Sequence, residues 1–209
     1  LKTRAYASHK ELFAWALYDF ANSGYTTVVQ TTIFSAYFVG VVAANTPAIT
    51  AGMATLLWSL AMSIANFIVM VSGPVIGAIA DYRDCKKQFL LISSIGCIVA
   101  TALLATVGAG DVLPGMLWVI ISAVMFAAGE NLIAAFLPEL VPEQKMGKIS
   151  GYGWSLGYFG GLLTLGICLA YISWARQQGL SEAQSVPVTL LITAAFFAMT
   201  ATRRFMRRK

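Results

Sequence analysis

Apolar residues fill six long stretches of the chain, and polar residues are concentrated in the short segments between them. The stretches cover residues 12–39, 55–80, 89–107, 116–137, 152–174 and 187–202. A helix needs roughly 20 mostly apolar residues to cross a hydrocarbon core of about 30 Å. The pattern therefore predicts an all-α membrane protein, a single bundle of six transmembrane helices within residues 1–209.

Composition and charge support this prediction and orient the chain. Hydrophobic residues make up 58% of the chain and charged residues only 11%, whereas a soluble domain carries about a quarter charged residues. All Lys and Arg residues except Arg176 lie in segments that would face one side of the membrane, and basic residues favour the cytoplasmic side. We therefore expect an integral protein of a bacterial inner (plasma) membrane, with both termini cytoplasmic and no nucleic-acid partner.

Two acidic residues lie inside the apolar stretches, Asp19 in the first and Glu130 in the fourth. At the rise of an α-helix both lie roughly 13 Å from the cytoplasmic end, so we expect them to be level near the bilayer midplane. An ionisable group at this depth costs about 2.5 to 3.5 kcal/mol on insertion scales, and the default hypothesis is a functional role. No Lys or Arg lies at the same depth, and desolvation favours a protonated carboxyl group. We hypothesise that at least one of the two gains and loses a proton as the protein works.

Further polar residues follow Asp19 along one face of the first predicted helix, and such a stripe lines a cavity or faces a partner helix. The residues predicted to line a substrate or proton pathway are Asp19, Asn22, Thr26, Gln30, Glu130 and Asn131, with the aromatic residues Trp15 and Tyr18; Ser23 lies on the same stripe. The structural alternative is that Asp19 only bonds to backbone in a tight helix contact. In that alternative Glu130 pairs with Asn131 or with a neighbouring amide.

Glycines recur at intervals of four residues in the fifth stretch, at Gly153, Gly157 and Gly161. Small residues at this spacing allow two helix backbones to approach closely, so these glycines predict a helix-packing face. They do not fit a nucleotide-binding loop, because the spacing is wrong and no strand precedes them. The three cysteines have no metal-ligand spacing. We expect no cofactor and no metal site.

The loop after the second stretch contains Gly77, Asp81 and Lys86. It resembles the cytoplasmic loop between helices two and three of the major facilitator superfamily, Gly-x-x-x-Asp-x-x-Gly-basic-basic. Asp84 and Cys85 depart from that pattern, at its second glycine and at its first basic position. The resemblance implies a gating loop formed by the three matching residues. The alternative is a solvated loop that only sets topology.

Residues 13–23 and residues 147–161 resemble, more specifically, the vacuolar amino-acid effluxer-like branch of that superfamily. This resemblance implies a secondary active transporter for a small solute, with amino acids as the best-known substrate class. It also implies that helices one and four line a central cavity. Each predicted triplet of helices has its acid in the first helix, which agrees with a 3+3 inverted repeat as in one half of a major facilitator fold.

The superfamily fold has twelve helices in two halves, and this chain resembles the amino-terminal half only. The carboxy-terminal half is therefore expected to be absent. Helices two and five face the other half in that fold, so the glycine face of helix five is expected to lack its partner. We expect a homodimer or a second six-helix half to complete the pore, with the lipid bilayer and a small solute as the other partners.

Two other functions are weighed against transport. A non-transporting membrane scaffold or assembly subunit would tolerate neutralisation of Asp19 and Glu130. An intramembrane aspartyl protease is suggested by Tyr18-Asp19 together with Gly108-Ala-Gly110-Asp111. However, Asp111 is predicted to lie more than about 15 Å in depth from Asp19, and two catalytic carboxylates must share one water. The sequence therefore does not predict an enzyme.

Overall fold

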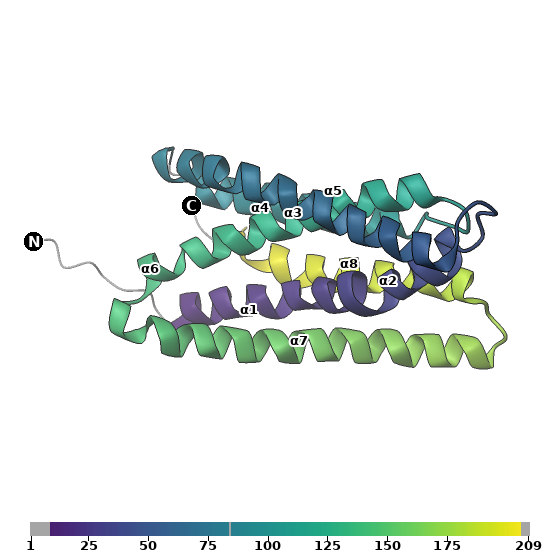
Figure 1. Ribbon diagram of the computed structural model, residues 1–209. Coiled ribbons are helices and arrows are strands. Elements are labelled where there is room, and N and C mark those ends of the chain that lie inside the picture. The colour runs from purple at the N-terminus through teal and green to yellow at the C-terminus, as the bar shows by residue number, and fades with distance from the viewer. Residues whose placement is uncertain (1–8, 84, 206–209) are drawn as a thin grey trace, which may run out of the picture.

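The computed structural model describes residues 9–83 and 85–205, and within these ranges the chain forms helices joined by short turns. Six helical segments of the described chain are long and apolar enough to cross a membrane. The predicted all-α membrane fold with six transmembrane helices is thereby confirmed. The first helix, α1 (His9–Tyr25), begins at the end of the bundle where the last helix, α8 (Glu182–Phe205), finishes (Figure 1).

The first span consists of α1, the π-helix η1 (Thr26–Thr32), α2 (Ile33–Tyr37) and the π-helix η2 (Phe38–Ala43). The next spans are α3 (Ala51–Tyr82), α4 (Lys86–Leu104) and α5 (Val112–Ala135), which is followed by the short α6 (Leu137–Leu140). The last two spans are α7 (Glu143–Gln177) and α8. Most spans extend beyond the apolar stretches, because hydropathy marks only the part at hydrocarbon depth. In contrast, α4 stops before the predicted end at residue 107.

The prediction of one regular helix over residues 12–39 is wrong in its second half, where π-helical turns begin at Thr26. The N–H of Ile33 bonds to the carbonyl of Val28, five residues earlier, instead of four. The hydroxyl of Thr31 donates to the carbonyls of Thr26 and Thr27 at 3.1 and 3.0 Å. Threonine hydroxyls thus occupy backbone acceptors that a regular α-helix would use, and such bonding is known to bend helices. The predicted polar stripe assumes α-helical spacing as far as Gln30, but the α-helix ends before that residue.

The helix contacts are repeated between the two triplets of spans. In the first triplet α1 packs against α7 and α8; in the second, α5 packs against α3 and α4. The first, second and third spans correspond to the fourth, fifth and sixth. The α1–α7 contact therefore corresponds to the α5–α3 contact, and the α1–α8 contact corresponds to the α5–α4 contact. The two third members, α4 and α8, pack against each other. This matches a 3+3 inverted repeat. The two second members, α3 and α7, lie on opposite sides of the bundle (Figure 1).

Aromatic side chains close the end of the bundle that lies opposite to Lys86. The rings of Phe34 and Phe38 are buried, and each lies within 6.0 Å of the Trp58 ring, centroid to centroid. Nearby, the N–H of Gly110 donates to the carbonyl of Val42 at 2.8 Å, which joins the loop before α5 to the end of η2. The two membrane acids lie between this closed end and the end that carries Lys86.

Candidate functional site

Asn22 of α1 links the region of the two membrane acids to α5. Nδ2 of Asn22 donates a hydrogen bond to Oε1 of Glu130 at 2.5 Å, and the Asn22 side chain is 1% exposed. Asp19 lies about one helical turn before Asn22, and its Oδ2 lies against Gly157 of α7. Glu130 thus bonds to the amide of Asn22, whereas Asn131 points elsewhere. The structure places both acids at one level of the bundle, with Asn22 joining their two helices.

The glycine face of α7 lies directly against α1. A Cβ added at Gly160 would lie only 2.0 Å from the backbone oxygen of Phe20, so the two backbones are in close contact. The buried glycines on this face are Gly153, Gly157, Gly160 and Gly161. The expectation that this face would lack its partner is therefore wrong. The resemblance assigned it to another half of the fold, but the first span of the same chain covers it.

The predicted packing glycines also leave room for functional side chains of α1. A Cβ at Gly157 would lie 2.7 Å from Oδ2 of Asp19, and a Cβ at Gly153 would lie 2.5 Å from the indole ring of Trp15. A Cβ at Gly161 would similarly collide with the hydroxyl of a threonine of η1. These glycines therefore admit side chains of the first span, and Gly157 leaves room for both Asp19 and Ser23.

The two aromatic residues assigned to the pathway point in different directions. Nε1 of Trp15 donates to the backbone oxygen of Ile133 at 2.9 Å, which links α1 to the end of α5. Tyr18 is 6% exposed, and its hydroxyl lies 3.1 Å from that of Ser94 on α4. A Cβ at Gly129 would lie 2.6 Å from the Tyr18 hydroxyl. Trp15 is thus close to the α1–α7 contact, whereas Tyr18 is part of the core.

The remaining predicted pathway residues are divided between two faces. Thr26 begins η1 and Gln30 lies within it, and both are partly buried. Asn131, by contrast, is exposed on α5 and faces α3, where its amide nitrogen would lie 4.0 Å from a Cβ on Gly73. The structure therefore groups Thr26 and Gln30 with the first span and separates Asn131 from its neighbour Glu130.

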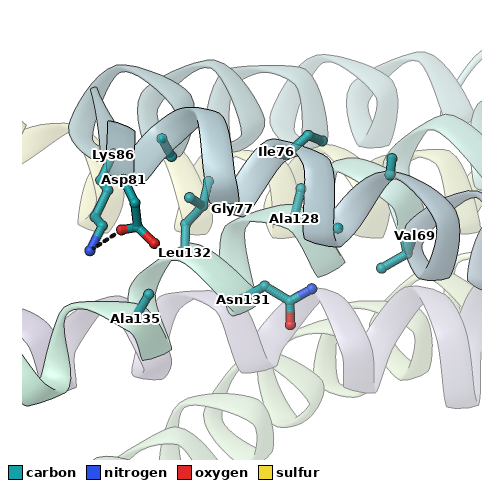
Figure 2. A pocket seen from close by; sticks show the side chains of 12 residues that line it. Val69, Ile76, Gly77, Asp81, Lys86, Ala128, Asn131, Leu132 and Ala135 are labelled. Atoms are coloured by element: carbon teal, nitrogen blue, oxygen red, sulfur yellow. Dashed lines mark ion pairs between the residues drawn. The ribbon is translucent and has the colours of Figure 1, made fainter. Parts of the chain in front are cut away.

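A narrow groove of about 60 Å³ separates α3 from α5, and Asn131 and Gly77 are among its lining residues (Figure 2). Asp81 and Lys86 lie at one end of it. Binding sites for small molecules have volumes of about 300 to 1,000 Å³. The groove is therefore too small to enclose a solute of amino-acid size by itself.

Lys86 joins three helices at this end of the groove. Its Nζ lies 2.6 Å from Oδ1 of Asp81 at the end of α3 and 2.6 Å from Oε1 of Glu139 on α6. Glu139 was not predicted as a partner. It comes close because the chain breaks between α5 and α6 at Pro138, which has no N–H to continue the helix. A proline next to an acid after an apolar stretch was the signal available in the sequence.

The sequence interpretation also missed three threonines, Thr27, Thr31 and Thr32. Each donates its hydroxyl hydrogen to a backbone oxygen of the first span, and Thr31 and Thr32 are exposed. The available signal was the occurrence of two threonine pairs, at residues 26–27 and 31–32, inside an apolar stretch. These hydroxyls extend the polar surface of Asp19 toward the aromatic end of the bundle.

The arrangement needed for an aspartyl protease is not formed. Oδ2 of Asp111 accepts a hydrogen bond from the N–H of Gly108 at 3.0 Å in the loop before α5. That loop is bonded to η2 at Val42, whereas Asp19 lies in α1 against Gly157 of α7. The described residues also contain no group of three or more His, Cys, Asp or Glu that could hold a metal ion.

Comparison with known proteins identifies the class and then the family. The chain is 32% identical over 198 residues to a protein of Bacillus subtilis (strain 168) named as the uncharacterized MFS-type transporter YxiO. Residues 41–207 match the family model described as vacuole effluxer Atg22 like, and the chain belongs to that family. Both findings confirm the resemblance to the major facilitator superfamily and to its effluxer-like branch.

The relative is much longer than this chain. The match covers 91% of the chain but only 44% of the Bacillus protein. No solved structure matches the chain significantly.

Proposed function

We propose that the chain is part of a secondary active transporter that moves a small solute across a bacterial inner membrane and couples this movement to protons. The observation that carries the proposal is that two acids, Asp19 and Glu130, lie at about one level inside the bundle, because Asn22, one helical turn after Asp19, bonds to Glu130. Membership of an effluxer family and similarity to an MFS-type transporter support it. Amino acids, the best-known substrates of the resembled branch, are the proposed solute class, and efflux is the proposed direction.

The amide of Asn22 provides a device with two states. As an ionised group Glu130 only accepts hydrogen bonds, and Nδ2 of Asn22 satisfies it. Oδ1 of Asn22 is buried without a hydrogen-bond donor among the described residues. Once Glu130 takes up a proton it becomes a donor, and rotation of the amide offers it Oδ1 instead. Protonation thus reverses the hydrogen bond that joins α1 to α5.

In this proposal Lys86, at the start of α4, and its two acidic partners form a gate at the cytoplasmic end. Lys86 holds the end of α3 against α6 through Asp81 and Glu139. Opening of the bundle at this end separates these helices and breaks at least one of the two ion pairs. Both carboxylates are largely exposed, at 64% and 43%, so exchange with water is accessible to them.

A second six-helix unit completes the transporter in this proposal, either another copy of the chain or a separate half. The relative is more than twice as long as the stretch that this chain matches. Native mass of the particle, extracted gently from its own membrane, tests this. A dimer or a complex with one similar subunit supports it, and a monomer contradicts it.

Solute-dependent proton movement in proteoliposomes tests the coupling. The chain, in the assembly found in its membrane, is reconstituted with a pH-sensitive dye inside the vesicles, and a panel of amino acids is added one at a time. We expect at least one solute to change the internal pH, and expect Glu130→Gln and Asp19→Asn to abolish or strongly reduce the change. Unchanged proton movement in both variants would contradict the coupling. A complete absence of transport, with neutralisation tolerated, would favour the scaffold.

A further inference from the structure

An open pocket of about 370 Å³ lies where α3 ends and α4 begins. Binding sites for small molecules have volumes of about 300 to 1,000 Å³, so this pocket is large enough to hold part of a ligand, unlike the groove between α3 and α5. We call it the turn pocket, because its residues flank the turn that joins the two helices. They are Ile79, Arg83, Cys85, Gln88 and Phe89.

The turn pocket is separate from the groove that ends at Lys86. On α3, Asp81 lines the groove, whereas Arg83, two residues later, lines the pocket. On α4, Lys86 lines the groove and Gln88 lines the pocket. Residues two apart point in nearly opposite directions from a helix, at about 100° per residue. Both helices pack against α5, and of the described residues those of α5 line only the groove.

The turn pocket has an apolar end and a polar end at different depths. Ile79 and Phe89 belong to the second and third apolar stretches, whereas Arg83, Cys85 and Gln88 lie between those stretches. Ile79 precedes Arg83 by four residues, which places it about 6 Å deeper at the rise of a helix. The pocket therefore extends from the edge of the hydrocarbon core to the level of the lipid head groups.

The polar end of the pocket carries a positive charge that is not neutralised within the described chain. Arg83 is exposed, and no described residue forms an ion pair with its guanidinium. Lys87, in the first turn of α4, is also exposed, and none of the described lining residues is acidic. Lys86, in contrast, is held by two carboxylates. The pocket thus favours a ligand with an anionic end and an apolar end.

We propose that the turn pocket binds the head-group end of an anionic phospholipid. A guanidinium matches a phosphate group through two parallel N–H donors, and the side-chain amide of Gln88 supplies two further N–H donors. Ile79 and Phe89 contact the first carbons of the chains, which continue into the bilayer. Basic pockets between transmembrane helices are known to bind anionic head groups. This inference goes beyond the proposed transport function and does not depend on it.

Cys85 provides a reporter for the occupied pocket. It is partly exposed, whereas Cys97 and Cys168, the other cysteines of the chain, are buried. A maleimide should therefore label the protein at Cys85, and Cys85→Ser should remove the label. The labelling rate is measured on the native assembly in a non-ionic detergent at constant ionic strength, with dioctanoyl phosphatidylglycerol, dioctanoyl phosphatidylcholine or inorganic phosphate added.

Phosphatidylglycerol is expected to slow the labelling of Cys85 at concentrations at which the other two compounds have no effect. Equal slowing by phosphatidylcholine would show that the charge of the head group is not recognised. Equal slowing by inorganic phosphate would show that the pocket takes a free anion instead of a lipid. Either result would overturn the proposal.

Variants of Arg83 locate the binding. Arg83→Gln is expected to weaken the protection by phosphatidylglycerol about tenfold, because a charge-assisted pair of hydrogen bonds is lost. Arg83→Lys should retain part of the protection, since it keeps the charge without the planar fork. Arg176→Gln is the matched control, because Arg176 is also an exposed arginine near a helix end, but on α7. Equal protection in the parent chain and Arg83→Gln would refute the proposal.

Native mass spectrometry of the gently extracted assembly gives a second readout that does not depend on the thiol. We expect phosphatidylglycerol to remain bound to the parent chain and to Arg176→Gln under conditions that release it from Arg83→Gln. Equal retention by all three proteins would refute the proposal. Neither measurement involves solute or proton movement, so failure of the lipid site and failure of the transport proposal are distinguishable.

Discussion

The contact between α1 and α7 and the contact between α3 and α5 are equivalent in the inverted repeat, yet they are packed differently. In the first, Gly160 brings the two backbones so close that a Cβ would lie 2.0 Å from a carbonyl oxygen. In the second, a groove of about 60 Å³ remains, and a Cβ at Gly77 would meet nothing within 4 Å. The two equivalent contacts thus differ: the α1–α7 contact beside Asp19 is closed, and the α3–α5 contact near Lys86 is open.

The comparison shows that glycine has two uses in this bundle. On α7 the glycines remove bulk so that Trp15 and Asp19 fit against a neighbouring helix. On α3, Gly73 and Gly77 line an unfilled groove. Two kinds of substitution test this difference. One adds a side chain at a glycine of each contact, and the other removes a polar side chain near each contact.

The largest effect is expected from Gly160→Leu. The new side chain must displace the α1 backbone, and overpacking of this kind costs typically about 1 to 3 kcal/mol and can cost more. We expect loss of most folded protein, measured as the monodisperse fraction after extraction in detergent. Gly166→Leu on the same helix is the control, because the space there is open. Equal yields of the two variants would show that the α1–α7 contact is not close.

The second effect is expected from Asn22→Leu, which removes the bond that joins α1 to Glu130. A fully buried acceptor left without its partner costs about 1 to 3 kcal/mol, and the partly buried Glu130 should lose somewhat less. We therefore expect a lower thermal unfolding midpoint. Asn131→Leu, at an exposed position on the same level of α5, should change stability by no more than about 0.5 kcal/mol. An equal fall of the midpoint in both variants would mean that the hydrogen bond between Asn22 and Glu130 contributes no particular stability.

A smaller effect is expected from Lys86→Met, at the end of the open groove. It removes both ion pairs, but Asp81 and Glu139 are solvent-exposed, so water and salt screen them and the loss is at most about 1 kcal/mol. The difference from the parent chain should shrink as salt is added. Arg176→Met, which removes the looser 3.4 Å contact to Glu182, should have less effect. A loss that does not depend on salt would mean that Lys86 acts through packing.

The smallest effect is expected from Gly77→Ala, which should raise the stability slightly instead of lowering it. The groove has room for a methyl group, and alanine is favoured over glycine within a helix by about 0.5 to 1 kcal/mol. We expect an unchanged or slightly raised unfolding midpoint. Clear destabilisation would mean that the groove is filled by another segment of the assembled protein.

The fold and the positions of the acids could be predicted because they depend on composition and helical rise. Apolar stretches alone specify six spans, and equal distances from the basic end place Asp19 and Glu130 at one level. The partner of the α7 glycines could not be predicted. Their spacing shows that one face of the helix carries small residues, but it does not show which helix packs against that face. The turns at Thr26 were also missed, since they depend on which carbonyls the threonine hydroxyls occupy. Glu139 meets Lys86 only through the break at Pro138.

The most direct test compares Glu130, which bonds to Asn22 inside the bundle, with Asp81 at the end of the open groove. Solute-dependent proton movement is measured in vesicles for the parent chain, Glu130→Gln and Asp81→Asn, at equal amounts of folded protein. The account predicts that Glu130→Gln loses proton movement, whereas Asp81→Asn keeps its proton-to-solute ratio even if its rate changes. Proton coupling that survives in Glu130→Gln but is lost in Asp81→Asn would contradict it.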